Sequence, residues 1–392
     1  TQKWTLFPYT TLFRSLKIPV LTADIIGKEN PEQFVLFSGH IDSWHYGAMD
    51  NGSANATMIE VARILQKFRH NLKRSIRIAF WSGHSHGRYA GSTAYCDEHW
   101  EELHENCVLH VYADSLGGKG ATILSESNCM AETKGIAEEI IKKIAKQSFI
   151  GSRYGKSADQ SFWGVGIPSL YMGMSEQPLT DDPRLQKVYA LFKVKESGGF
   201  GWWWHTVEDT LDKIDPANLK RDCEVYLLSI YNVLTSKLLP INHLAAVQEL
   251  KSIVENYQYD AGSYVNLAKT MKRLTQLELL VMEYEQTKLT ISDSCTQLHT
   301  INKYLMELSR FLVPLNYVAG DRFDHDLAAG TQPIPSLSVI NQLAKVEKSS
   351  DEYFLLQTSI KRKVNKVNYE LKQAITVAEK LKSVLEKQML EN

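Results

Sequence analysis

The sequence predicts an α/β domain, with a mostly parallel sheet flanked by helices, followed by an all-α helical bundle. Up to about residue 240, short apolar runs with strand character alternate with helical patterns. After residue 240 glycine becomes scarce, no strand pattern is visible, and apolar residues recur at helical spacing. The chain of 392 residues is also too long for one ordinary core, which favours two domains.

The first residues are set apart from the rest. Residues 5–15, TLFPYTTLFRS, resemble the translation of a common sequencing-adapter oligonucleotide. We therefore expect residues 1–15 to be a non-native, adapter-derived segment without a role in the fold. The α/β domain is expected over residues 16–240, truncated at its N-terminus, and the helical domain over residues 241–392.

Within the α/β domain, five apolar runs have the length and composition of strands. They are residues 20–26, 34–38, 75–81, 108–113 and 169–172. The segments between them are expected to be helices. The helical pattern is clearest in residues 53–69 and 133–147. Their apolar residues, such as Met58, Val61 and Leu65, recur every three or four positions, which predicts an apolar stripe packed on the sheet.

The second part of the chain has the pattern of antiparallel helices joined by loops. Helices are expected over residues 248–256, 264–287, 294–312, 336–348 and 352–390. Residues 316–337 interrupt them with two glycines and two prolines, so we expect a loop there.

Composition excludes several classes of function. A formal net charge of −1 does not favour binding to nucleic acid or to an anionic membrane. No apolar run approaches the roughly 20 residues that a membrane helix needs. The five cysteines are scattered and contain no C-x-x-C pair, so we expect buried free thiols and neither a disulfide framework nor a thiolate zinc site.

Polar residues with metal-binding side chains gather near the predicted strand ends, where open α/β sheets bind their ligands. His40 follows one strand, Asp50 precedes a helix, Asp114 follows another strand, and His205 follows a loop rich in glycine and tryptophan. Each alone would be an ordinary polar residue or a helix cap. Together, imidazole nitrogens and carboxylate oxygens are ligands of hydrolytic zinc, and one carboxylate can bridge two metals about 3.5–4 Å apart.

Several blocks around these residues occur in a fixed order. They are GHIDSWHYGAMDNGSANATMIEVARIL, RSIRIAFWS, GSTAY, HVYADSLGG, SADQSFWGVGIPS and WHTVEDTLDKID. As a set they resemble a family of peptidases that includes bacterial zinc aminopeptidases, glutamate carboxypeptidases and transferrin receptors. The resemblance covers about residues 20–239 and implies a zinc-exopeptidase-like fold, whose members are often secreted or at the cell surface.

The resemblance also implies roles for single residues. Asp50 would bridge two zinc ions, His40 and Asp114 would complete one site, and His205 would belong to the other. Asp42 matches a position that supports the site by hydrogen bonding a ligand histidine.

For the helical part, the resemblance implies a transferrin-receptor-like dimerisation domain, hence a homodimer. Residues 322–337, RFDHDLAAGTQPIPSL, would form a loop that approaches the peptidase domain. A protease-associated domain is expected upstream of the chain.

One block departs from the family pattern. Active relatives carry two consecutive glutamates, a general base and a metal ligand, where this chain has His84 and Ser85 within SGHSHGRYAGS. A serine hydroxyl is a poor zinc ligand, so either His84 or His86 replaces the carboxylate or the second metal is weakly held. A free His84, with an ordinary pKa near 6.5, could act as the base instead.

The sequence therefore predicts a two-metal zinc hydrolase that removes a terminal residue from peptides, of aminopeptidase or carboxypeptidase type. Its catalytic residues would be His84, His86 and Asp42, and Arg88 and Arg153 could bind a substrate carboxylate. The alternatives are an inactive homologue that serves as a binding or scaffold protein, and a hydrolase of non-peptide amides.

Overall fold

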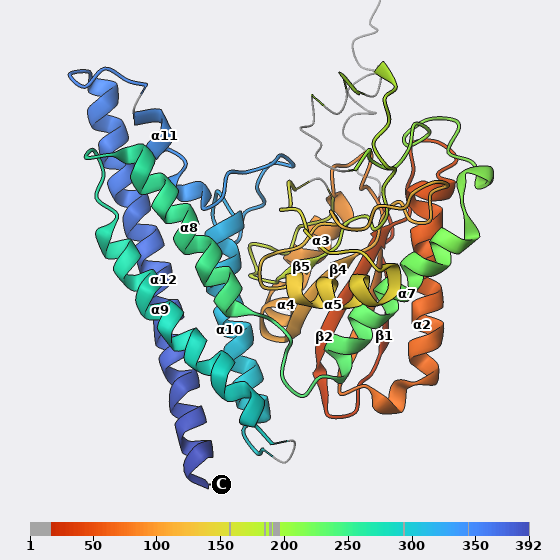
Figure 1. The fold of residues 1–392 in the computed structure, drawn as a ribbon, viewed down its shortest axis with the longest axis horizontal. Helices are drawn as coiled ribbons and strands as arrows, with labels where there is room; N and C mark the ends of the chain where they lie inside the picture. Colours follow the sequence, from red (N-terminus) through yellow and green to blue (C-terminus); the bar gives the residue numbers. More distant parts are fainter. Residues whose placement is uncertain are drawn as a thin grey trace, which may run out of the picture.

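A computed structural model describes residues 17–156, 158–183, 186–187, 190, 197–292, 295–343 and 345–391 (Figure 1). The expected adapter-derived segment, residues 1–15, lies outside these described residues. A twisted sheet with its flanking helices lies on one side of the molecule, and a bundle of long helices lies on the other.

The sheet is mostly parallel, as predicted. Its order is β1-β3-β2-β4-β5. The edge strand β1 (Leu21–Ile25) runs antiparallel to β3 (Arg74–Trp81). The strands β2 (Asn30–His40), β4 (Cys107–Tyr112) and β5 (Ser169–Leu170) continue the sheet in parallel register from β3.

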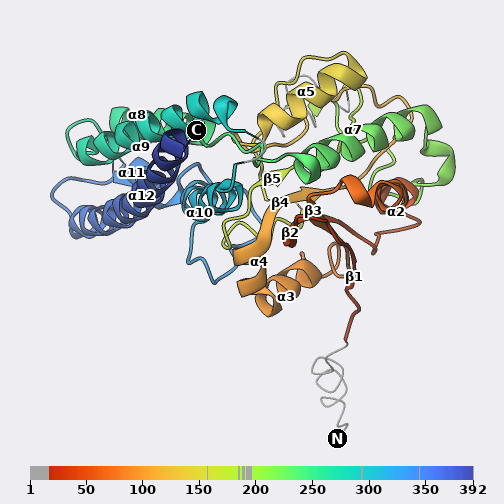
Figure 2. The same ribbon diagram turned by 90° about the horizontal axis from the view of Figure 1, so that it is seen from below.

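Helices cover both faces of the sheet (Figure 2). On one face lie α2 (Ala54–Lys67), α5 (Lys134–Ala145) and α7 (Pro216–Thr235). Of these three helices, α7 alone was not predicted from the sequence. On the other lie α3 (Ala90–Glu98) and α4 (Trp100–Asn106). This two-sided cover explains why the central strands are continuous apolar runs in the sequence.

The helical part consists mainly of α8 (His243–Ala261), α9 (Ala268–Thr287), α10 (Leu298–Tyr317) and α12 (Asp351–Glu391). The last of these packs along both α9 and α10. Among the described residues, no helix combines the length and apolar character needed to cross a membrane.

The helix predicted over residues 336–348 is wrong. The structure has a 3₁₀ turn at Pro335–Leu337 and one short helix, α11 (Ile340–Leu343). Ile334, Leu337, Ile340 and Leu343 are all buried. Residues 338 and 339 form a turn between the 3₁₀ turn and α11, so the apolar spacing marks buried residues but not one continuous α-helix.

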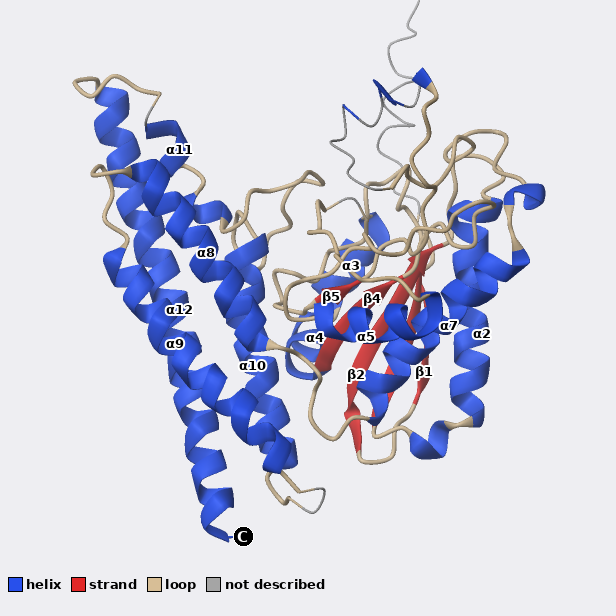
Figure 3. Ribbon diagram, viewed as in Figure 1, coloured by secondary structure: helices blue, strands red, loops and turns tan. Residues whose placement is uncertain are grey.

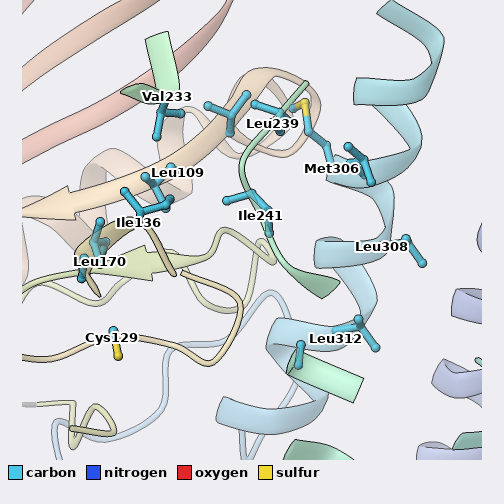
Figure 4. Packing of buried hydrophobic residues seen from close by; sticks show 14 of the residues in the cluster. Leu109, Cys129, Ile136, Leu170, Val233, Leu239, Ile241, Met306, Leu308 and Leu312 are labelled. Carbon is cyan, nitrogen blue, oxygen red and sulfur yellow. The ribbon is translucent and has the colours of Figure 1, made fainter. Parts of the chain in front are cut away.

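One hydrophobic cluster runs from the sheet into the bundle (Figure 4). Leu239 and Ile241, in the segment that joins α7 to α8, are buried between the two parts. The cluster continues on the bundle side through α10 with Met306, Leu308 and Leu312. The domain division at residue 240 therefore stays a proposal, because the two parts share a core. All five cysteines are unpaired, and four of them are buried.

A loop of the bundle reaches over the α/β part, as the resemblance implied (Figure 1). His325 Nε2 lies 2.7 Å from an Asp97 carboxylate oxygen. Arg88 donates to the Ala328 carbonyl at 2.9 Å, and Lys156 donates to the Asp326 carbonyl at 2.6 Å. The loop is thus tied to the segment between β3 and α3, to α3 itself and to Lys156.

Candidate metal centre

The long loops of the α/β part gather at the end of the sheet where the parallel strands finish (Figure 3). His40 is the last residue of β2, Asp114 follows β4 by two residues, and His84 lies in the loop after β3. Parallel strands end at one edge of the sheet, so residues far apart in the sequence meet there.

The four predicted metal ligands come together around Asp50. One carboxylate oxygen of Asp50 lies 3.0 Å from His40 Nε2, and the other lies 2.9 Å from His205 Nε2. Asp114 adds an oxygen 3.4 Å from the same His40 nitrogen. The Asp50 carboxylate therefore stands between two histidines, the arrangement that a bridging ligand requires.

The chemistry of this cluster fits a cation. His40 is fully buried, and neither its Nε2 nor the facing Asp50 oxygen has a hydrogen-bond partner of good geometry. Burial by itself lowers the pKa of His40, but the Asp114 and Asp50 carboxylates outweigh it and raise this pKa to about 11. Two buried carboxylates thus need a positive charge beside them, and zinc bound by nitrogen and oxygen atoms can supply it.

Two residues outside the predicted set hold the Asp50 loop. Asn51 donates its side-chain amide to the carbonyls of His40 and Ala113, at 3.2 and 3.1 Å, and so ties the ends of β2 and β4 together. The Asp209 carboxylate accepts from the backbone N–H groups of Met49 and Asp50, at 2.8 and 3.0 Å. Asp209 lies four residues after His205, in the block WHTVEDT. Its hydrogen bonds therefore join the His205 segment to the Asp50 loop.

Asp42 hydrogen bonds His40, as the resemblance implied, but through its backbone carbonyl and not through its carboxylate. His40 Nδ1 donates to the backbone carbonyl of Asp42 at 2.7 Å, whereas the carboxylate of Asp42 lies 3.9 Å from the same nitrogen. The carboxylate instead accepts from the backbone N–H groups of His84 and Ser85, at 3.1 and 2.8 Å. Asp42 therefore fixes the loop that replaces the two glutamates.

His84 is held by Asp159, which the sequence analysis did not single out. Its Nδ1 lies 2.7 Å from an Asp159 carboxylate oxygen, and the Tyr112 hydroxyl donates to the same oxygen at 2.7 Å. Burial raises the pKa of Asp159, but hydrogen bonds from His84, Ser92 and Tyr112 outweigh it and lower this pKa below its usual value. Asp159 lies in the block SADQSFWGVGIPS, which was the available signal.

His84 also stacks on His40, with ring centroids 3.8 Å apart and planes inclined by 7°. Ligand-type atoms of His40, His84 and Asp114 all lie within 4.8 Å of one another. We predicted either a ligand role or a base role for His84. Its position beside His40 and Asp114 is compatible with both roles.

Ser85 and His86 differ in their surroundings. Ser85 is buried, and its hydroxyl has no hydrogen-bond partner. His86 is exposed and packs edgewise against Trp44, with ring centroids 4.8 Å apart. Trp44 also contacts His205, at 6.0 Å between centroids.

The two arginines predicted to bind a substrate carboxylate are engaged elsewhere. Arg153 stacks over Tyr317 at 3.9 Å and donates to the Asn316 carbonyl at 2.7 Å. It joins the α/β part to α10, and its role in binding substrate stays a prediction. Arg88 is exposed and donates to the bundle loop, so its role in binding substrate stays a prediction.

These features define an α/β fold whose strand ends carry a cluster of histidines and carboxylates with the chemistry of metal ligands. The model of peptidase family M28 matches residues 21–229, more than half of the chain. The chain belongs to this family.

Among curated proteins, the chain resembles a probable glutamate carboxypeptidase VP8 of Zea mays, with 32% identity over 70% of this chain and 41% of that protein. It also resembles aminopeptidase NAALADL1 of Rattus norvegicus, with 24% identity over 78% of this chain and 45% of that protein. The chain thus spans less than half the length of these relatives. A solved zinc aminopeptidase from Bacillus subtilis is similar over 55% of this chain and 50% of its own, with 22% identity and a TM-score of 0.44.

Proposed function

We propose that the protein is a two-metal zinc hydrolase that removes a terminal residue from peptides. The observation that supports this most directly is the Asp50 carboxylate, whose two oxygens face His40 and His205 at 3.0 and 2.9 Å. Membership of peptidase family M28 supports the same reaction class. His40, Asp50 and Asp114 form a three-ligand set for one ion, and His205 shares Asp50 for the second.

When bound, zinc supplies Lewis acidity to the scissile carbonyl and to water. The protein has to hold these ions, orient the substrate and accept a proton from water. His84 and His86 are the imidazoles proposed for the proton, and Asp42 fixes the loop that carries both.

The test is zinc analysis of purified protein combined with a panel of aminoacyl and acidic dipeptide substrates. Both kinds are needed because one relative is a probable carboxypeptidase and another an aminopeptidase. We expect bound zinc and zinc-dependent release of a terminal residue from one class. A zinc-loaded protein that hydrolyses nothing on the panel would contradict the proposal.

The departure at His84 and Ser85 supports a second candidate, an inactive homologue that acts as a binding or scaffold protein. Four costly polar residues kept at one site argue against it. Hydrolysis of non-peptide amides but not of peptides would instead identify an amidohydrolase.

We also propose that the protein forms a homodimer through its helical part. The helices α9 and α12 pack along each other and still expose apolar side chains, among them Leu279 and Tyr369. An exposed apolar surface of this kind is stabilised by burial against a second subunit. Light scattering should give twice the mass of the chain, and a stable monomer would argue against the dimer.

A further inference from the structure

We propose that His84 is the residue that accepts the proton from water, and that Asp159 is the positioning residue that prepares it for this step. The inference rests on the proposed hydrolase function and chooses between the two roles that were open for His84. It assigns to a histidine and aspartate pair the step for which active relatives carry a glutamate.

The stacking of His84 on His40 argues against both rings binding one ion. An imidazole holds a metal close to its own ring plane, about 2.0–2.1 Å from the nitrogen. The two planes are nearly parallel, at 7°, with centroids 3.8 Å apart. Stacked rings stay in van der Waals contact, about 3.5 Å apart, so an ion in the plane of His40 would lie beyond bonding distance of His84. His84 therefore sits beside the ion that His40 would hold, where water would also lie.

Asp159 sets which nitrogen of His84 carries the hydrogen. Its carboxylate can only accept, so the hydrogen of His84 lies on Nδ1, 2.7 Å from Asp159. The other nitrogen, Nε2, is then left with a free lone pair. A carboxylate that holds an imidazole in this way also stabilises the imidazolium that forms after proton transfer.

Asp159 is itself firmly placed. It is fully buried and accepts hydrogen bonds from the Tyr112 hydroxyl at 2.7 Å and the Ser92 hydroxyl at 2.5 Å. At the other end of His84, Asp42 accepts from the backbone N–H. Both the ring and the backbone of His84 are thus fixed by carboxylates, and little reorganisation is needed during the reaction.

The step balances as follows. An O–H bond of water breaks, its proton goes to His84 Nε2, and the electron pair stays on oxygen, which bonds to the scissile carbonyl carbon while the π pair of the C=O bond moves to the carbonyl oxygen. That pair then re-forms the C=O bond as the C–N bond breaks. The C–N electron pair goes to nitrogen, and the proton on His84 passes to this leaving nitrogen. No oxidant or further reactant is required.

His70 provides a matched control. It is an exposed histidine in the 3₁₀ turn Arg69–Asn71, which precedes β3, whereas His84 lies in the loop that follows β3. Removing the His70 imidazole should leave the pair of His84 and Asp159 intact.

The experiment compares wild-type protein with His84→Ala, Asp159→Asn and His70→Ala. Zinc affinity is measured by competition with a chromophoric chelator, and kcat and KM on the best substrate of the panel. All three variants should keep zinc affinity within about threefold, short of the roughly 10- to 100-fold loss caused by disturbing a ligand's supporting partner. His84→Ala and Asp159→Asn should lower kcat by about 10²- to 10⁴-fold with little change in KM.

His70→Ala should stay close to wild type in every measurement. Added imidazole should restore part of the kcat of His84→Ala but none of that of Asp159→Asn, whose own imidazole still occupies the site. Circular dichroism melting curves show whether each variant is folded.

Two results would overturn the inference while leaving the proposed function intact. One is wild-type kcat in His84→Ala, and the other is loss of zinc affinity in that variant, which would make His84 a ligand. A zinc-loaded wild type that hydrolyses no substrate would remove the proposed function and this inference together.

Discussion

Asp50→Asn is expected to lose tightly bound zinc and, with it, hydrolytic activity. The asparagine keeps the shape of the side chain, but it removes the charge and one of the two oxygens that face His40 and His205. Disturbing only a supporting partner of a ligand costs about 10- to 100-fold in metal affinity, so loss of the shared ligand should cost more than this. Zinc per chain after dialysis, measured by atomic absorption, should fall towards zero.

Asp24→Asn is the matched control for this prediction. It makes the same chemical change at Asp24, an aspartate of the edge strand β1. Asp24 pairs with Arg77 of β3 and is not among the residues that surround Asp50. Zinc content and activity should be those of wild type. Equal zinc content in Asp50→Asn and wild type would show that Asp50 is not a ligand.

Arg310→Met is expected to cause the largest loss of stability. Arg310 lies on α10, is 2% exposed, and donates to the carbonyls of His104, Gly166 and Cys107 at 2.7, 2.8 and 2.6 Å. The His104 carbonyl belongs to the last turn of α4, where helix carbonyls have no partner within the helix. A bundle residue thus caps a helix of the α/β part.

Methionine would fill similar space but leave these carbonyls buried and unpaired. A buried acceptor left without a partner costs about 1–3 kcal/mol. Because three carbonyls lose their donor, we expect the free energy of unfolding, from urea titration, to fall by about 3 kcal/mol or more. Arg63→Met removes an exposed arginine paired with Glu60 on α2, and it should leave stability close to that of wild type. Equal stability of the two variants would contradict the role given to Arg310.

The sequence by itself determined the class of fold and the position of the site. Burial can be predicted from short stretches of sequence, because apolar residues repeat every two positions in a half-buried strand and every three or four in a helix. The same patterns mark strand ends, and parallel strands end at one edge of the sheet. His40 and Asp114 could therefore be expected at one edge of the sheet, whereas Asp50 and His205 were assigned to the same centre because their blocks resemble those of the peptidase family.

Only the tertiary structure decided which side chains pair within that centre and across the two parts of the chain. Asp159 lies 75 residues from His84, and Arg153 lies 163 residues from Asn316. No local period records such contacts, since each depends on how separate loops and helices pack together. The carboxylate of Asp42 likewise accepts from the backbone N–H groups of His84 and Ser85 rather than from the His40 imidazole. Periodicity records which residues are buried, whereas hydrogen-bond partners are chosen by the packing of elements that are distant in the sequence.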